Sequence, residues 1–166
     1  MAPGTLTFFT GKMGAGKSTL AAQIARQQQA VLLSEDEWLS ALYPGQITSV
    51  KDYITYAERL KSQMQPLVQA MLAAGTSVVM DFPANTTAQR AWFKAIFTAV
   101  AAPHRLVFID VSDALCLQQI EKRRLAEPHR AATDTPEMFA RISAYFQPPA
   151  AAEGFNVETP ATLTSP

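Results

Sequence analysis

Cysteine and histidine are scarce in this sequence: Cys116, His104 and His129 are the only ones among 166 residues. One thiol excludes an internal disulfide, and the spacing of the three residues does not match a zinc site. No apolar run approaches the roughly 20 residues that cross a bilayer, and the amino terminus lacks the charged-then-apolar order of a signal peptide. We therefore expect a cytoplasmic protein without a membrane partner.

Excess charge is also absent, because 14 lysines and arginines balance 14 aspartates and glutamates. A neutral chain has no overall field to attract DNA, RNA or an anionic membrane, which disfavours long nucleic acid as a partner. The length allows one hydrophobic core. We expect a single domain over residues 1–160 and a frayed tail at 161–166, where periodicity is lost.

One motif carries the strongest functional signal. The segment from Gly11 to Ser18 matches the pattern G-x-x-x-x-G-K-[ST], after an apolar run at 6–9 and before residues at helical spacing. Such a loop aims backbone N–H groups at phosphates, Lys17 reaches the β- and γ-phosphates, and the Ser18 hydroxyl binds Mg²⁺. The residues predicted to bind ATP are Gly11, Lys12, Met13, Gly14, Ala15, Gly16, Lys17, Ser18 and Thr19.

Hydrophobic patterning predicts alternating strands and helices. Strands are expected at 5–10, 30–34, 76–81, 105–111 and 155–158. Helices are expected at 17–28, 35–42, 52–74, 86–100, 112–126 and 135–146. The inner strand runs are apolar without alternation, which is typical of parallel strands covered on both faces. The pattern predicts an α/β fold with a central parallel sheet.

Acidic residues follow two of these strands, at the sheet edge where open parallel sheets bind ligands. Asp36 comes just after the second strand and is our candidate general base for an acceptor hydroxyl. The alternative is that Ser34, Glu35 and Asp36 cap the next helix. Asp81 ends the third strand and is expected to bind Mg²⁺ with Ser18 or to contact the acceptor; the alternative is an ordinary loop carboxylate.

Basic residues near the end of the chain predict a lid. Transfer to an acceptor needs cations on the phosphates and a cover that excludes water. Residues 122–124 are basic and end a helix, and with Arg130 they predict a short lid at about 123–135. We expect Arg123 to be a catalytic cation and Arg130 to help bind the nucleotide. The alternative is that these residues complement the helix dipole.

The acceptor site is expected to include Arg90 and Trp38. Arg90 lies one turn into the helix after Asp81 and is a candidate contact for an anionic group, or a solvated helix residue. Trp38 lies near Tyr43 and other tyrosines that would line a pocket for a ring-bearing or sugar substrate, or belong to the core.

The chain resembles the small phosphate-loop kinases of the zeta-toxin, chloramphenicol phosphotransferase and polynucleotide-kinase-like set, and bacterial AAA-family ATP-binding proteins of that kind. The matching segments are Gly11–Ser18, Leu33–Trp38, Leu42–Pro44, Gly75–Asn85, Gln89–Arg90, Cys116 with Arg123, Phe146–Pro149 and Glu153–Val157. The resemblance implies a three-layer P-loop fold of the nucleoside-monophosphate-kinase class, ATP with Mg²⁺, Asp36 as base, and Arg123 closing over the phosphates.

One position departs from part of that set. Its polynucleotide 5′-kinases usually carry an arginine three residues after the aspartate, and this chain has Leu39 there. The departure disfavours a nucleic-acid end as substrate. Other members act on antibiotics, sugars and nucleotide sugars, so the resemblance does not fix the acceptor.

The sequence therefore predicts an ATP-dependent phosphotransferase that moves the γ-phosphoryl group to a hydroxyl of a small polar molecule. One alternative is an NTPase or nucleotide-dependent switch that acts through a protein partner, because phosphate loops also serve switches. A second is a polynucleotide 5′-hydroxyl kinase, and a third is a non-catalytic scaffold that keeps an ATP site for stability. The pattern sets neither the acceptor nor the oligomeric state.

Overall fold

The computed structural model describes residues 2–128, 130 and 133–160. Within these ranges one parallel sheet has the strand order β2-β3-β1-β4-β5. Its strands are β1 (Leu6–Thr10), β2 (Val31–Ser34), β3 (Val78–Asp81), β4 (His104–Phe108) and β5 (Val157–Glu158). The expected tail at 161–166 and three lid positions, 129, 131 and 132, lie outside the described residues.

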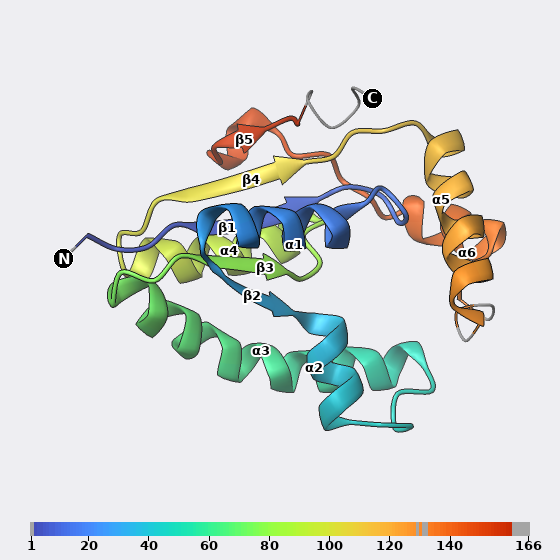
Figure 1. Cartoon of the computed structure of the whole chain (residues 1–166), viewed down its shortest axis with the longest axis horizontal. Coiled ribbons are helices and arrows are strands. Elements are labelled where there is room, and N and C mark those ends of the chain that lie inside the picture. The colour runs from blue at the N-terminus through green and yellow to red at the C-terminus, as the bar shows by residue number, and fades with distance from the viewer. Residues whose placement is uncertain (1, 129, 131–132, 161–166) are drawn as a thin grey trace.

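Helices flank the sheet (Figure 1). They are α1 (Lys17–Gln28), α2 (Glu35–Leu42), α3 (Val50–Ala73), α4 (Thr87–Ala99), α5 (Asp113–Ala126), α6 (Pro136–Ser143) and the short 3₁₀ helix η2 (Ala151–Glu153). Among the described residues, no helix combines the length and apolar character that crossing a membrane requires.

The central strand β1 shows how helices pack on both faces of the sheet. All five of its residues are buried. Leu6 and Phe8 point into a core shared with α3 and α4, where Phe8 stacks on Phe93 with ring centroids 4.4 Å apart. Phe9 points to the opposite face, into a core shared with α1 and α5. Helices thus cover both faces of a sheet whose strands all pair in parallel, and this confirms the predicted α/β fold with a parallel sheet.

The predicted ends of the elements also agree well with the structure. Gly75 adopts a left-handed conformation, with φ of 88°, just after α3, as expected of a helix C-cap. The clearest differences are the last helix, which ends at Ser143 and not at residue 146, and the fourth strand, which ends at Phe108 and not at residue 111. Ile109 still donates to the Thr10 carbonyl, but the chain then leaves the sheet so that Ser112 can cap α5, and Asp110 is exposed.

Arg90 occupies a different environment from the one we expected. Its side chain is completely buried, and its guanidinium donates to both carboxylate oxygens of Glu153, at 2.8 and 3.2 Å. It also donates to the carbonyls of Ala84 and Pro148. The residue therefore ties α4 to the C-terminal segment, and in this conformation it offers no surface to an acceptor. Helical spacing could not distinguish this inward position from a solvated one.

This ion pair generates a stability prediction. Arg90→Ala would remove the buried cation that neutralises the Glu153 carboxylate. We therefore expect the free energy of unfolding, measured by urea denaturation with circular dichroism, to fall by about 3 kcal/mol. Lys94→Ala is the matched control, because exposed Lys94 contacts the same segment from the surface: it donates to the Glu153 carbonyl and lies over the Phe155 ring, 5.6 Å from its centroid. That control should change stability by less than about 0.5 kcal/mol. Equal stability of the two variants would contradict the structural role of Arg90.

Candidate active site

The phosphate loop joins β1 to α1 through two left-handed glycines. Gly14 has φ of 79° and Gly16 has φ of 100°, conformations that side-chain-bearing residues rarely adopt. A Cβ on Gly14 would also lie 2.7 Å from the Cys116 carbonyl oxygen, on α5. The loop can therefore turn into α1 only with glycine at these positions. Its remaining residues are anchored: Lys12 pairs with Asp113 at 2.8 Å, and Ala15 is buried.

Lys17 lies folded over this loop. Its ammonium donates to the carbonyl oxygens of Gly11 and Lys12, the latter at 3.0 Å. Burial lowers the pKa of Lys17 to about 8, against the opposing effect of the Asp81 carboxylate, and the positive charge of Arg123 lowers it further. The loop thus brings together the lysine, the acid at the end of β3 and a lid cation, three residues that the sequence predicted for one site.

Ser18 and Asp81 are the residues predicted to bind Mg²⁺. Ser18 is exposed in the first turn of α1, next to exposed Thr19, and Asp81 ends β3 at the same edge of the sheet. In the described part of the chain, no group of three or more His, Cys, Asp or Glu residues could hold a metal ion alone. One hydroxyl and one carboxylate fit a Mg²⁺ ion whose other ligands are phosphate oxygens and water.

Asn85 is a site residue that sequence reasoning missed. The Gly11 N–H donates to its Oδ1 at 3.0 Å, and the Thr10 hydroxyl donates to the same oxygen at 3.3 Å. Gln89 and Gln147 hold the Asn85 backbone through bonds of 2.8 Å each. The side chain therefore braces the start of the phosphate loop. Its position just after β3 was the available signal.

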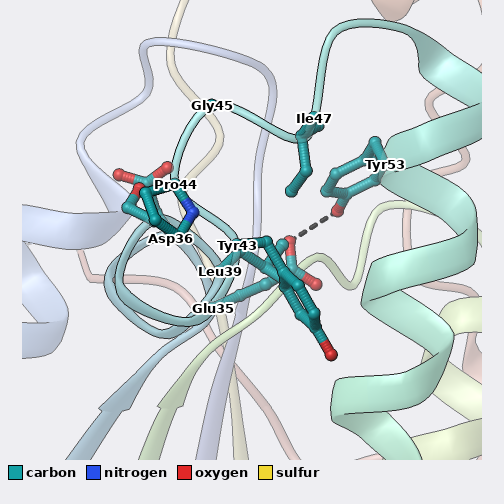
Figure 2. Close-up of a pocket in the computed structure, with 9 residues that line it drawn as sticks. Glu35, Asp36, Leu39, Tyr43, Pro44, Gly45, Ile47 and Tyr53 are labelled. Carbon is teal, nitrogen blue, oxygen red and sulfur yellow. Dashed lines mark hydrogen bonds between the residues drawn. The ribbon is translucent and has the colours of Figure 1, made fainter.

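Two of the carboxylates on α2, those of Glu35 and Asp36, point in different directions (Figure 2). Ser34, and not an acid, caps this helix by accepting from the Glu37 N–H. The Asp36 side chain is 82% exposed and lies 3.8 Å from the Arg130 guanidinium. Glu35 is buried and turned towards α3. Ser34 therefore fills the cap position, while Asp36 lies in the first turn of α2, where an acid also complements the helix dipole.

A cavity of about 300 Å³ lies between α2 and the start of α3. It is lined by Glu35, Asp36, Leu39, Ser40, Tyr43, Pro44, Gly45, Ile47 and Tyr53. The Tyr53 hydroxyl donates to Glu35 Oε1 at 2.5 Å. Burial raises the pKa of Glu35, an effect that the Tyr53 bond partly offsets, and burial also raises the pKa of Tyr53, which stays a donor. Sequence reasoning treated Glu35 only as a capping residue.

The lid cations have distinct partners. Arg123 forms a two-bond pair with the buried carboxylate of Asp134, at 2.7 and 2.9 Å. Arg130 pairs with Glu127 at 3.1 Å and approaches Asp36. Arg124 instead pairs with Glu121, three residues earlier on the same helix. Arg123, near the end of α5, is thus held by Asp134 while its charge acts on Lys17, and Arg130, between α5 and α6, lies near Asp36. The role of Asp134 as the partner of Arg123 was not predicted.

A family model described as an AAA domain matches residues 6–149 of this sequence. The chain belongs to this AAA domain family. Among curated proteins, none matches it.

Solved structures give the fold of this AAA domain. The Mycobacterium tuberculosis APS kinase CysC in complex with AMPPNP and APS has a TM-score of 0.66 and 22% identity, covering 97% of this chain and 91% of that one. An unliganded sugar kinase from Janibacter sp. HTCC2649 has a TM-score of 0.60 and 18% identity, covering 99% and 88%. The predicted resemblance to small P-loop kinases is confirmed at the level of fold.

Two residues predicted for the acceptor site of this AAA domain are not among those that line the cavity. Arg90 is in the interior, as described above. Trp38 is 36% exposed on α2 but does not line the cavity, which takes Tyr43 and Tyr53 instead. Consecutive helical residues point about 100° apart, so proximity in sequence did not identify the side chains that share a face.

The pKa of Lys17 predicts a pH-dependent affinity for nucleotide. Phosphate favours the charged ammonium, and in the free protein this ammonium loses its proton near pH 8. We expect Mg²⁺–AMPPNP affinity to fall about tenfold between pH 7 and 9.5, with proton uptake on binding near pH 8.5. Calorimetry in buffers of different ionisation enthalpy measures both. Lys17→Met should bind Mg²⁺–AMPPNP weakly at every pH. If the affinity of that variant still fell with pH as steeply as that of the wild type, Lys17 would be excluded as the source of the pH dependence.

Proposed function

We propose that this protein is an ATP-dependent phosphotransferase that moves the γ-phosphoryl group of ATP to a hydroxyl of a small polar molecule. The observation that carries the proposal is the position of Asp36. This residue lines the cavity beside α2 and also lies 3.8 Å from Arg130 of the lid segment. One carboxylate therefore faces both a space for an acceptor and a cation suited to the transferring phosphate.

The residues of the site divide the work of transfer. The amides of the Gly11–Ser18 loop and Lys17 bind the phosphates, while Arg123 and Arg130 neutralise charge that develops on the moving group. Ser18 and Asp81 would hold Mg²⁺, which when bound neutralises phosphate charge.

Asp36 takes the proton in this scheme. It accepts the proton of the acceptor hydroxyl as the new oxygen–phosphorus bond forms and the bond between the γ-phosphorus and the β-phosphate oxygen breaks, which releases ADP.

Two features of the cavity favour a small acceptor over a polynucleotide end. Its volume is near the lower end of the range for small-molecule sites. Leu39, at the position where an arginine would grip a nucleotide phosphate, is buried in the core and lines the cavity with an apolar side chain. The solved relatives include a sugar kinase and a kinase complex with AMPPNP and APS, both named for small molecules.

The base role of Asp36 is tested by Asp36→Asn. We expect the rate of transfer from γ-labelled ATP to fall by about 10² to 10⁴, the usual contribution of a general base, with AMPPNP affinity unchanged. Glu37→Gln is the matched control, because Glu37 is an exposed acid on the same helix that does not line the cavity. Its transfer rate should equal that of the wild type.

The same assay separates the rival functions. Equal product from wild type and Asp36→Asn would refute the base role. Slow ATP hydrolysis that no hydroxyl compound accelerates, but a protein partner does, would favour the switch. Transfer of label to a 5′-hydroxyl oligonucleotide would favour the end kinase.

A further inference from the structure

The charges that line the acceptor cavity have one sign. Of the nine residues around it, Glu35 and Asp36 are acidic and the others carry no charge. A smaller cavity of about 150 Å³ shares Glu35 and Tyr53 and adds Glu58 and Lys61. Across both cavities, three carboxylates therefore face one ammonium.

The charge of Lys61, the one lysine of this region, opposes the rise that burial causes in the pKa of Glu35, but within the described chain the two residues form no salt bridge. Lys61 lines the smaller cavity, and its Nζ lies over the Trp92 ring, 4.8 Å from the ring centroid. Arg90, the other cation that we had considered for the acceptor, is buried against Glu153. Within the described chain, the main cavity therefore has no cationic lining residue that could bind a phosphate or carboxylate group of an acceptor.

Glu35 has one carboxylate oxygen that receives no hydrogen bond from the described residues. It is only 7% exposed. In the described part of the chain, Tyr53 is the only donor to it: the bond goes to Oε1, and Oε2 receives none. No described lysine, arginine or histidine lies within salt-bridge distance of either oxygen. Oε2 is not one of the fully buried side-chain atoms without a partner in the described chain, so it is open to the cavity and can accept a hydrogen bond from a ligand.

The walls beside Glu35 suit a cation. Tyr43 and Tyr53 line the same cavity, and aromatic rings together with a carboxylate are the usual surroundings of a bound ammonium. Tyr43 is fixed by packing on Tyr56, with ring centroids 4.2 Å apart. Figure 2 shows the Glu35 carboxylate turned towards Tyr53 and the Asp36 carboxylate turned away from it.

We propose that the acceptor is a hydroxyl compound that carries a protonated amine, of the amino sugar or amino alcohol class. Its ammonium donates to Glu35 and lies against Tyr43 and Tyr53, while its hydroxyl faces Asp36. This inference rests on the proposed phosphotransferase function and adds a specificity residue, Glu35, that does not take part in the chemical step. A cavity of about 300 Å³ accommodates a molecule of monosaccharide size.

Three matched compound panels test the charge preference: amino sugars and amino alcohols, their neutral hydroxyl counterparts, and their phosphorylated counterparts. Transfer from γ-labelled ATP is measured for each as kcat/KM. We expect the best amino compound to exceed its neutral counterpart by at least about tenfold, as a charged hydrogen bond would give, and the phosphorylated compounds to be poorest. A preference for neutral or phosphorylated compounds would overturn the inference and leave the phosphotransferase proposal intact.

Glu35→Gln identifies the residue responsible, since it keeps the shape of the side chain and removes its charge. We expect KM for the amino acceptor to rise roughly tenfold to hundredfold with little change in kcat, so that the preference over the neutral counterpart disappears. Tyr53→Phe should give a smaller rise in KM. Glu37→Gln, on the exposed side of α2, should keep the preference. An unchanged preference in Glu35→Gln would overturn the assignment.

Binding distinguishes failure of the inference from failure of transfer. The amino and neutral panels are titrated by calorimetry into protein saturated with Mg²⁺–AMPPNP. Tighter binding of amino compounds to the wild type but not to Glu35→Gln supports the inference even if no transfer is seen, and the phosphotransferase proposal alone then fails. Equal affinity for both panels overturns the inference.

Discussion

A turn that only glycine can make is the constraint on which this site depends. With φ of 79° and 100°, Gly14 and Gly16 reverse the chain after β1 while the loop backbone packs directly on α5. The turn leaves the loop amides open at the sheet edge and begins α1 at Lys17. It also brings Lys17 close to Asp81 and Arg123, which come from segments far away in the sequence.

Paired charges connect other segments of the molecule to one another. Arg90 and Glu153 connect α4 to the C-terminal segment. Arg123, near the end of α5, pairs with Asp134, just before the start of α6. In each pair one partner is almost fully buried, so removal of the other would leave a desolvated charge. Asn85 adds a neutral link between the phosphate loop and the start of α4. Residues without a proposed role in catalysis, such as Asn85 and Asp134, thus help to position the phosphate loop and Arg123.

The net charge of zero conceals a division of charge within the site. Cations gather where phosphates would lie: Lys17 in the loop, with Arg123 and Arg130 in the lid segment. Carboxylates gather on α2, where Glu35 and Asp36 line the cavity. Opposite local fields a short distance apart favour ligands of opposite charge in neighbouring subsites. The overall composition disfavoured long nucleic acid as a partner but could not reveal this arrangement.

The sequence by itself determined the fold class, the order and approximate bounds of the elements, and the phosphate loop, because these follow from local periodicity, turn chemistry and a contiguous motif. Tertiary structure alone decided which side chains share the cavity. Arg90 faces the core and Glu35 faces the cavity, although spacing along a helix allowed the reverse for both. The partner that draws Arg90 inward is Glu153, 63 residues away, and the partner of Glu35 is Tyr53 on another helix. Pairing between such distant residues is set by how the layers pack, and no local pattern encodes it.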